Sequence, residues 1–113
     1  MPPIRLLGND VVDVADPWAV GRARDRRFLD RVLSPAEADW LAGSQRPEQD
    51  LWVLWSAKEA AFKAWSRIRP SLVFAPSRFE VDPEAGVVQG PGGVCPVEWD
   101  RAPGRVHCLA CAA

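Results

Sequence analysis

Lys58, Glu59 and Lys63 lie within the most apolar helical stretch of the sequence, residues 50–65. The stretch DLWVLWSAKEAAFKAW is rich in helix-forming residues and contains neither Gly nor Pro, which predicts one helix. At about 3.6 residues per turn its apolar residues surround the axis, and a helix that is apolar on all sides is buried. Lys58 falls inside the arc of large apolar residues, while Glu59 and Lys63 lie on its flank. A buried charge is costly unless it is paired, hydrogen-bonded or metal-bound, so these residues indicate a site for a metal or a charged ligand.

An exposed ion pair is the alternative for two of these residues. Glu59 and Lys63 have the favourable i, i+4 order, which stabilises an exposed helix by only about 0.2–0.5 kcal/mol. Their neighbours on the helical wheel, Trp52 and Ser56, do not form a charged face. The sequence therefore favours the site over the simple surface pair.

Two acidic residues lie in the first predicted strand, IRLLGNDVVDV, which we expect to be broken near Gly8. Asp is unfavourable in strands, so Asp10 and Asp13 are candidates for function. On a straight strand the two side chains point to opposite faces, so either one alone enters a site or the strand bends after Val12. The alternative is that both carboxylates cap the following turn.

Helices must connect this strand to the helix over residues 50–65. Asp16 is the predicted N-cap of a helix that begins at Pro17 and is divided at Gly21. Ser34 and Glu37 have the spacing of a capping box, which predicts a second helix that ends at Gly43.

Strands dominate the sequence after residue 70. Two are predicted around the turn DPEAG, and CPVEWD and RVHCLACAA supply two more, separated by APG. A strand, then helices, then antiparallel strands indicate the α+β class, and residues 1–113 are expected to form one domain. We expect the last strand to lie at an edge of the sheet that another chain covers.

Composition excludes several classes of protein. The chain has 113 residues, 48% of them hydrophobic, and its net charge of −1 gives no general affinity for nucleic acid or an anionic membrane. No apolar run approaches the ~20 residues of a membrane span, and the first residues lack a signal-peptide core, so the cytoplasm is the expected location. Three cysteines argue against a disulfide framework, and Cys108 and Cys111 are expected to be free thiols because i and i+3 on a strand point to opposite faces.

The most basic part of the sequence follows the first strand. Its arginines include Arg24 and Arg27, which share a face if the segment is helical. They indicate a docking surface for an acidic partner. The alternative is a solvated surface on which Asp25 and Asp30 pair with them.

Three motifs together resemble the 4′-phosphopantetheinyl transferase superfamily, in its holo-acyl-carrier-protein synthase branch. They are GNDVVDV near the start, RFLDRVLSPAE after it, and LWSAKEAAFKAW about fifty residues beyond the first. The resemblance implies transfer of the 4′-phosphopantetheine arm of coenzyme A to a serine of an acyl or peptidyl carrier protein, with release of adenosine 3′,5′-bisphosphate. Such phosphoryl transfer depends on positioning and charge neutralisation, for which Mg²⁺ is suited.

The same resemblance implies roles for individual residues. Asp10 and Glu59 match the Mg²⁺ ligands, and Asp13 matches a further acid that binds the metal in the outer shell or through water. Lys63 matches the lysine that meets the pyrophosphate, and Lys58 matches a lysine that holds a coenzyme A phosphate. Glu59 is expected to receive the serine proton, directly or through a water molecule.

Relatives with one such domain per chain build the site between subunits, so the resemblance implies a homo-oligomer, with a trimer favoured by analogy. Two alternatives remain at this point. The chain could be a half-domain that binds coenzyme A or a carrier protein without catalysis, or an unrelated α+β interaction domain with accidental motifs. The retained Asp10, Glu59 and Lys63 favour the enzyme.

Overall fold

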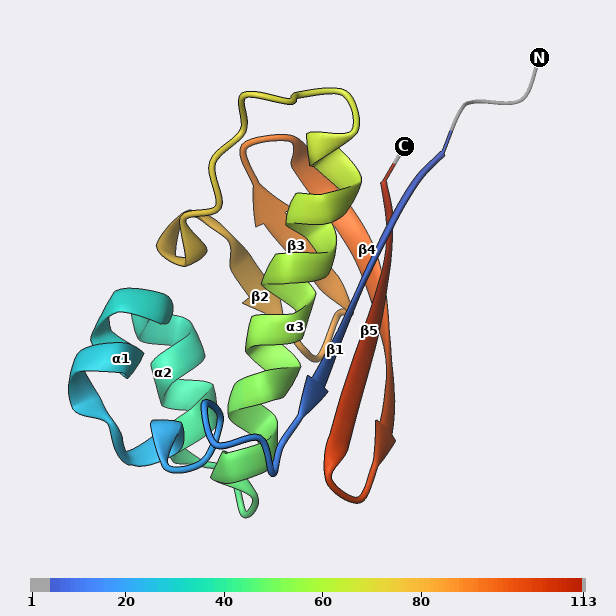
Figure 1. Ribbon diagram of the computed structural model, residues 1–113. Coiled ribbons are helices and arrows are strands. Elements are labelled where there is room, and N and C mark those ends of the chain that lie inside the picture. Colours follow the sequence, from blue (N-terminus) through green and yellow to red (C-terminus); the bar gives the residue numbers. More distant parts are fainter. Residues whose placement is uncertain (1–4, 113) are drawn as a thin grey trace.

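A five-stranded antiparallel sheet covered on one face by a long helix forms the framework of the protein. The computed structural model describes residues 5–112. The strand order in the sheet is β1-β5-β4-β3-β2, and Figure 1 shows the helix α3 lying across it. The strands are β1 (Leu6–Asp13), β2 (Glu80–Asp82), β3 (Val87–Gly90), β4 (Gly93–Ala102) and β5 (Arg105–Ala112). The predicted α+β class and the predicted order of strand, helices and antiparallel strands are confirmed.

Strand β1 runs without interruption through Gly8, so the predicted break at this residue is wrong. Gly8 is instead required by the close approach of α3. A side-chain Cβ at this position would meet the carbonyl oxygen of Ala60 and lie 2.6 Å from the backbone nitrogen of Ala64. The missing side chain therefore lets β1 lie directly against the helix that carries the candidate site residues.

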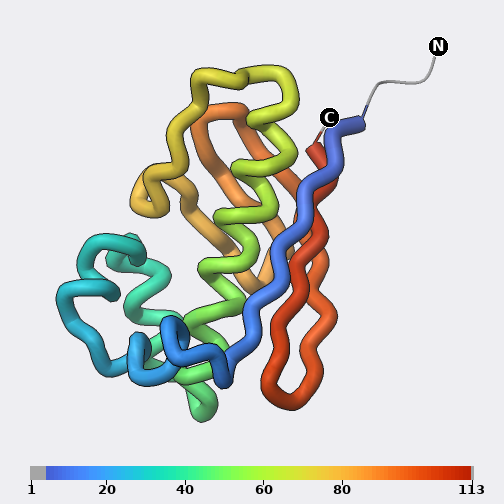
Figure 2. The backbone as a smooth tube through the Cα atoms, viewed as in Figure 1, coloured from blue at the N-terminus to red at the C-terminus, as the bar shows by residue number. Residues whose placement is uncertain are grey.

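Strand β5 lies inside the sheet, so the expectation that its outer edge is covered by another chain is wrong. It pairs with β1 on one side and with β4 on the other, and the edge strands are β1 and β2. Figure 2 shows the backbones of β1 and β5 running side by side. The order of strands in a sheet depends on contacts between distant segments, which the pattern within β5 does not report.

Helix α3 (Pro47–Ser66) is the central element of the core. It begins with a proline, which is favourable in a first helical turn, and with Glu48 and Asp50, which complement the positive end of the helix dipole. Its residues Leu51 and Leu54 are fully buried. The helix packs against β1 and β5, whose inward-facing residues include Val12 and Val106. The prediction of a buried helix over residues 50–65 is confirmed, and the helix is longer at its N-terminal end.

Two short helices, α1 (Arg26–Val32) and α2 (Pro35–Ala42), lie beside α3 on the side away from β1 (Figure 1). The predicted capping box of α2 is confirmed, because Ser34 and Glu37 each accept a backbone N–H from the other residue. The predicted helix from Pro17 is wrong. The carboxylate of Asp16 accepts the N–H of Trp18 in a turn, and Asp25 is the residue that caps α1.

Two 3₁₀ turns, η1 (Arg22–Arg24) and η2 (Pro76–Arg78), complete the connections. Gly21 adopts a positive φ of 83° immediately before η1, so it separates the turn after β1 from the arginine segment. No helix within residues 5–112 is long and apolar enough to cross a membrane.

Candidate active site

Asp10 and Glu59 reach the same surface hollow from two different elements. Asp10 lies on the inward face of β1, and Glu59 lies on the side of α3 that meets this strand. Both residues line the hollow, and Trp18 and Trp55 form part of its wall. The close contact at Gly8 places strand and helix near enough for the two carboxylates to share one opening.

Lys63 lies one turn of α3 beyond Glu59 and contacts Asp10. Its ammonium donates to Oδ1 of Asp10 at 3.0 Å and to the carbonyl oxygen of Asn9 at 3.0 Å. The side chain of Lys63 is 46% exposed and that of Asp10 is 14% exposed. The lysine also lines a second hollow, with Ser66 and Arg67, so it stands between an acidic opening and a basic one.

The electrostatics of the two carboxyl groups are coupled. Burial raises the pKa of Asp10 above its ordinary value, and the ion pair with Lys63 opposes this rise. Burial also raises the pKa of Glu59, the neighbouring Asp10 carboxylate adds to the rise, and Lys63 opposes it. Two partly buried acids therefore share one compensating cation, and together they favour binding of further positive charge.

Asp13 lies at the rim of the same hollow, but its carboxylate has a partner in the backbone. It accepts the N–H of Ala15 at 2.9 Å, as expected for a residue that caps the turn after β1. Burial alternates along β1, with Asp10 half-buried toward α3 and Asp13 exposed, so Asp13 reaches the hollow only at its edge.

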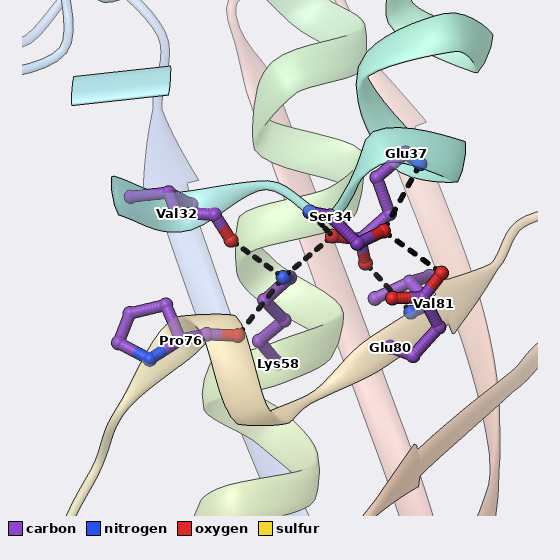
Figure 3. Close-up of polar contacts among 7 residues, drawn as sticks. All are labelled: Val32, Ser34, Glu37, Lys58, Pro76, Glu80 and Val81. Carbon is purple, nitrogen blue, oxygen red and sulfur yellow. Dashed lines mark hydrogen bonds and ion pairs between the residues drawn. The ribbon is translucent and has the colours of Figure 1, made fainter. Parts of the chain in front are cut away.

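Lys58 lies in a different environment from the one that the resemblance implied. The side chain is fully buried, and its ammonium donates to Glu37, to the carbonyl oxygen of Val32 and to that of Pro76 (Figure 3). Burial lowers the pKa of Lys58, and the Glu37 carboxylate opposes this effect. Because three acceptors occupy all three N–H bonds of an ammonium, this geometry argues against a contact between Lys58 and a phosphate of coenzyme A.

Arg24 and Arg27 are both exposed, but they do not share the face of one helix. Arg24 ends η1 and Arg27 lies in α1, and the extended backbone of Asp25 separates the two elements. Asp25 pairs with Arg22 at 3.2 Å rather than with either of these residues. Both guanidinium groups are therefore exposed, and the backbone at Asp25, between η1 and α1, determines how they lie relative to each other.

The sequence analysis did not predict that Glu37 pairs with Lys58 or that Arg67 binds the backbone of β1. Glu37 was accounted for by the capping box, so nothing in its local pattern pointed to Lys58, which lies 21 residues further along the chain. Arg67 lies one turn beyond Lys63, and its Nε donates to the carbonyl oxygen of Leu7 at 2.7 Å. Because residues four apart are neighbours on a helix, the spacing of Arg67 from Lys63 could have predicted that the two side chains lie close together.

Two carboxylates are too few to hold a metal ion by protein ligands alone, but they suit a magnesium ion that also binds water and phosphate. Within residues 5–112, no group of three or more His, Cys, Asp or Glu side chains is arranged to hold a metal. Mg²⁺ commonly uses one or two carboxylates and fills its other positions with water and phosphate oxygens. Asp10 and Glu59, with their raised pKa values in one opening, match that donor set.

The arrangement of these elements is that of a known class of proteins. A family model described as the 4′-phosphopantetheinyl transferase superfamily matches residues 6–92, which include β1, the three helices and the first strands of the second half. The chain belongs to this superfamily, and the resemblance noted in its three motifs is confirmed.

Particular relatives place the chain within that superfamily. It is 37% identical over 76 residues to holo-acyl-carrier-protein synthases of Yersinia pestis (strain Pestoides F) and Yersinia pseudotuberculosis (serotype O:1b). These matches cover 66% of this chain but only 59% of the length of the relatives. Among solved structures, the ACPS–CoA complex of Chronobacterium ammoniagenes is similar with a TM-score of 0.69 at 19% identity, covering 96% of each chain. Holo-acyl-carrier-protein synthase of Thermotoga maritima has a TM-score of 0.67 at 19% identity, covering 94% of this chain and 61% of that one. At these identities the structural matches establish the shared fold.

Proposed function

We propose that the protein transfers 4′-phosphopantetheine from coenzyme A to a serine of an acyl or peptidyl carrier protein in a Mg²⁺-dependent reaction. One observation carries the proposal: Asp10 from β1 meets Lys63 and Glu59 from α3 at a single opening. Membership of the superfamily and the similarity to holo-acyl-carrier-protein synthases support the same activity. A half-domain that only binds its ligands would not need two partly buried carboxylates and a lysine brought together from a strand and a helix.

Asp10 and Glu59 would hold the metal ion, and Asp13 would act at its periphery. The ion would neutralise charge on the pyrophosphate of coenzyme A. The two carboxylates come from a strand and a helix that are packed in contact, so their separation is fixed before any ligand binds. Such preorganisation lowers the cost of assembling the site. The turn capped by Asp13 keeps that acid at the rim rather than between the other two.

Glu59 is the group that we propose receives the proton of the carrier serine. Its raised pKa makes it a better proton acceptor than an exposed glutamate. The serine Oγ forms a bond to the phosphorus that bears the pantetheine arm, and the bond between this phosphorus and the bridging oxygen breaks. Adenosine 3′,5′-bisphosphate leaves with the electron pair, and Lys63 stabilises the charge that develops on it.

The arginine segment would receive the carrier protein. Arg24 and Arg27 are exposed on the elements that follow the metal-binding strand. An acidic partner would be steered toward such a surface by long-range attraction. Because η1 and α1 lie next to the wall residue Trp18 in the chain and in space, the carrier serine could then reach the opening.

We further propose a homo-oligomer, with a trimer favoured by analogy to single-domain relatives. The sheet face opposite α3 exposes Leu7, Val11 and Leu109, which are 52%, 54% and 45% exposed. Neighbouring exposed apolar residues on one sheet face are typical of a surface that another subunit covers. The free thiols of Cys95, Cys108 and Cys111 fit a reducing compartment, and we propose the cytoplasm.

Mass spectrometry of an apo carrier protein tests the activity. The carrier is incubated with the protein, coenzyme A and Mg²⁺, and the expected result is a gain equal to the mass of phosphopantetheine. A parallel reaction with excess chelator should leave the carrier unmodified. Binding of coenzyme A or of the carrier without this mass gain would instead identify a non-catalytic half-domain.

A further inference from the structure

Lys58 and Glu37 form a buried ion pair that the proposed reaction does not use. The side chains are both fully shielded from solvent, and Lys58 Nζ lies 2.7 Å from Oε1 of Glu37. The same ammonium donates to the carbonyl oxygen of Val32 at 2.7 Å and to that of Pro76 at 2.9 Å. A neutral amine has only two N–H bonds, so three acceptors require the charged form.

The partner carboxylate is equally committed to the protein. Oε1 of Glu37 also accepts the N–H of Ser34 at 2.9 Å, and Oε2 accepts the N–H of Val81 at 2.7 Å. The hydroxyl of Ser34 in turn donates to Glu80 at 2.8 Å. Both side chains are fully shielded from solvent, so neither member of the pair is presented to a substrate that approaches from outside.

Net stability does not account for such a pair. The desolvation of two buried charges offsets much of their attraction, and apolar replacements of similar volume often leave a protein equally stable or more stable. The role of the pair is therefore better sought in the segments that it joins. As Figure 3 shows, the end of α1, the start of α2 and η2 converge on Lys58 of α3, and β2 joins them through Glu37, which accepts the N–H of Val81.

Two of these connections lead to the candidate active site. Lys58 directly precedes Glu59 in α3, and Val32 is the last residue of α1. Earlier in α1, the ring of Phe28 packs against Trp55 with centroids 5.7 Å apart and against Trp18 at 6.3 Å. Since Trp18 and Trp55 line the opening shared by the two carboxylates, a displacement of α1 would disturb the packing of this wall.

We propose that Lys58 and Glu37 are a positioning pair, which holds α1 in one place against the helix that carries Glu59 and Lys63. The pair thereby fixes the aromatic wall of the opening and the arginines of the basic segment. Its kinetic consequence rests on the proposed function, but its effect on the aromatic wall does not. The motifs that contain Glu37 and Lys58 thus act together through one buried contact.

The test replaces both charges while keeping the shape of the pair. In the double variant Lys58→Met/Glu37→Gln, the Gln amide oxygen can still accept the N–H of Val81 or of Ser34. Near-ultraviolet circular dichroism measures the packing of Trp18 and its aromatic neighbours. Steady-state kinetics measures kcat and the KM values for carrier and coenzyme A.

We expect a folded double variant whose near-ultraviolet spectrum differs from that of the wild type. Its kcat/KM for the carrier should fall at least tenfold, while the KM for coenzyme A changes less than threefold. Val88→Ala is the matched control, because Val88 is fully buried in β3, within the other half of the sheet. It should lower the melting temperature while keeping the wild-type spectrum and the kinetics of folded protein.

A double variant with a wild-type spectrum and a kcat/KM within twofold of wild type would overturn the positioning role. If the double variant does not fold, the same two measurements on Lys58→Met/Glu37→Met decide the question, since this apolar pair leaves no buried charge without a partner. A wild-type protein that modifies no carrier would remove the proposed function. The spectral comparison with Val88→Ala would then decide the inference by itself.

Discussion

The ammonium of Lys63 lies 3.0 Å from Oδ1 of Asp10, so the cation nearest to the proposed metal ligand belongs to the protein itself. A metal ion bound by Asp10 would be repelled by this ammonium across the same carboxylate. Lys63 is nearly half exposed and lines the neighbouring basic hollow, so it can leave Asp10 without disrupting the core. We infer that it competes with a divalent cation until a phosphate ligand draws it away.

Removal of this competition should strengthen metal binding. In the absence of coenzyme A, Lys63→Met is expected to bind Mn²⁺, a probe for Mg²⁺, about two- to fivefold more tightly than the wild type. This range corresponds to about 0.4–1 kcal/mol, which lies within the range for exposed ion pairs. Calorimetric titration with Mn²⁺ measures it. Arg67→Met removes a charge one turn further on, and equal gains in both variants would mean that charge alone is responsible.

Loss of either carboxylate should abolish transfer. Asp10→Asn and Glu59→Gln preserve side-chain size but remove a metal ligand, so kcat/KM should fall about 100-fold or more while the far-ultraviolet circular dichroism remains that of the wild type. Glu98→Gln is the control, because Glu98 is an exposed carboxylate on β4. Near-normal turnover of either site variant at saturating Mg²⁺ would show that the metal is held elsewhere.

The raised pKa of Glu59 predicts a specific pH dependence of stability. The folded protein holds the Glu59 proton more tightly than the unfolded chain, whose glutamate has the ordinary value of 4.5. The favourable contribution is therefore complete below this value and is lost as the pH rises through the raised pKa. Glu59→Gln should melt a few degrees higher than the wild type at pH 7 without metal, and the difference should vanish below pH 4.5. A difference that is constant with pH would contradict this origin.

Charge reversal at the arginine segment should weaken carrier binding selectively. Arg24→Glu/Arg27→Glu is expected to raise the KM for the carrier and to flatten its salt dependence, because the Debye length falls from about 10 Å at 0.1 M to about 3 Å at 1 M. The KM for coenzyme A should not change. The control Arg5→Glu/Arg69→Glu makes the same change in net charge at exposed residues outside the arginine segment. Equal effects of the two double variants would place docking elsewhere.

Replacement of Gly8 in β1 should reduce both the stability of the fold and the rate of transfer. Gly8→Ala introduces a Cβ against the backbone of α3 and should destabilise the fold by about 1–3 kcal/mol. It should also lower turnover of the remaining folded protein, because β1 must move away from α3 and carry Asp10 with it. Chemical denaturation and kinetics at low temperature measure the two effects. Gly43→Ala, where a Cβ would meet only atoms at 3.7 Å or more, should change neither.

Local patterns were sufficient to predict most elements of the fold. The capping box of Ser34 and Glu37 and the DPEAG turn between β2 and β3 depend on residues that are close in sequence, and both are present. The helix start at Asp16 was wrong because two aspartates, Asp16 and Asp25, precede candidate helices. Only the folded chain determines that Asp16 closes a turn while Asp25 caps α1.

The site residues within the family motifs could be predicted from the sequence, but hydrogen-bond partners on distant segments could not. The motif resemblance correctly brought Asp10, Glu59 and Lys63 together, because their pattern is specific to a family whose fold is shared. The environment of Lys58 was not predictable from a helical wheel. Its acceptors come from Val32, Glu37 and Pro76, which lie on three other segments of the chain, and a wheel reports only the side of the helix on which a residue lies.

The pairing of β1 with β5 has a consequence for synthesis of the protein on the ribosome. Leu6 lies opposite Ala112 and Asp10 lies opposite Cys108, so β1 has its only sheet neighbour among the residues translated late in the described chain. Contacts between such distant segments form slowly, because a long loop must close first. While the hairpin of β4 and β5 is still inside the exit tunnel, β1 is an apolar strand without a partner. Until β5 emerges, the strand that carries the proposed metal ligand Asp10 is therefore an unpaired edge, open to association with other chains.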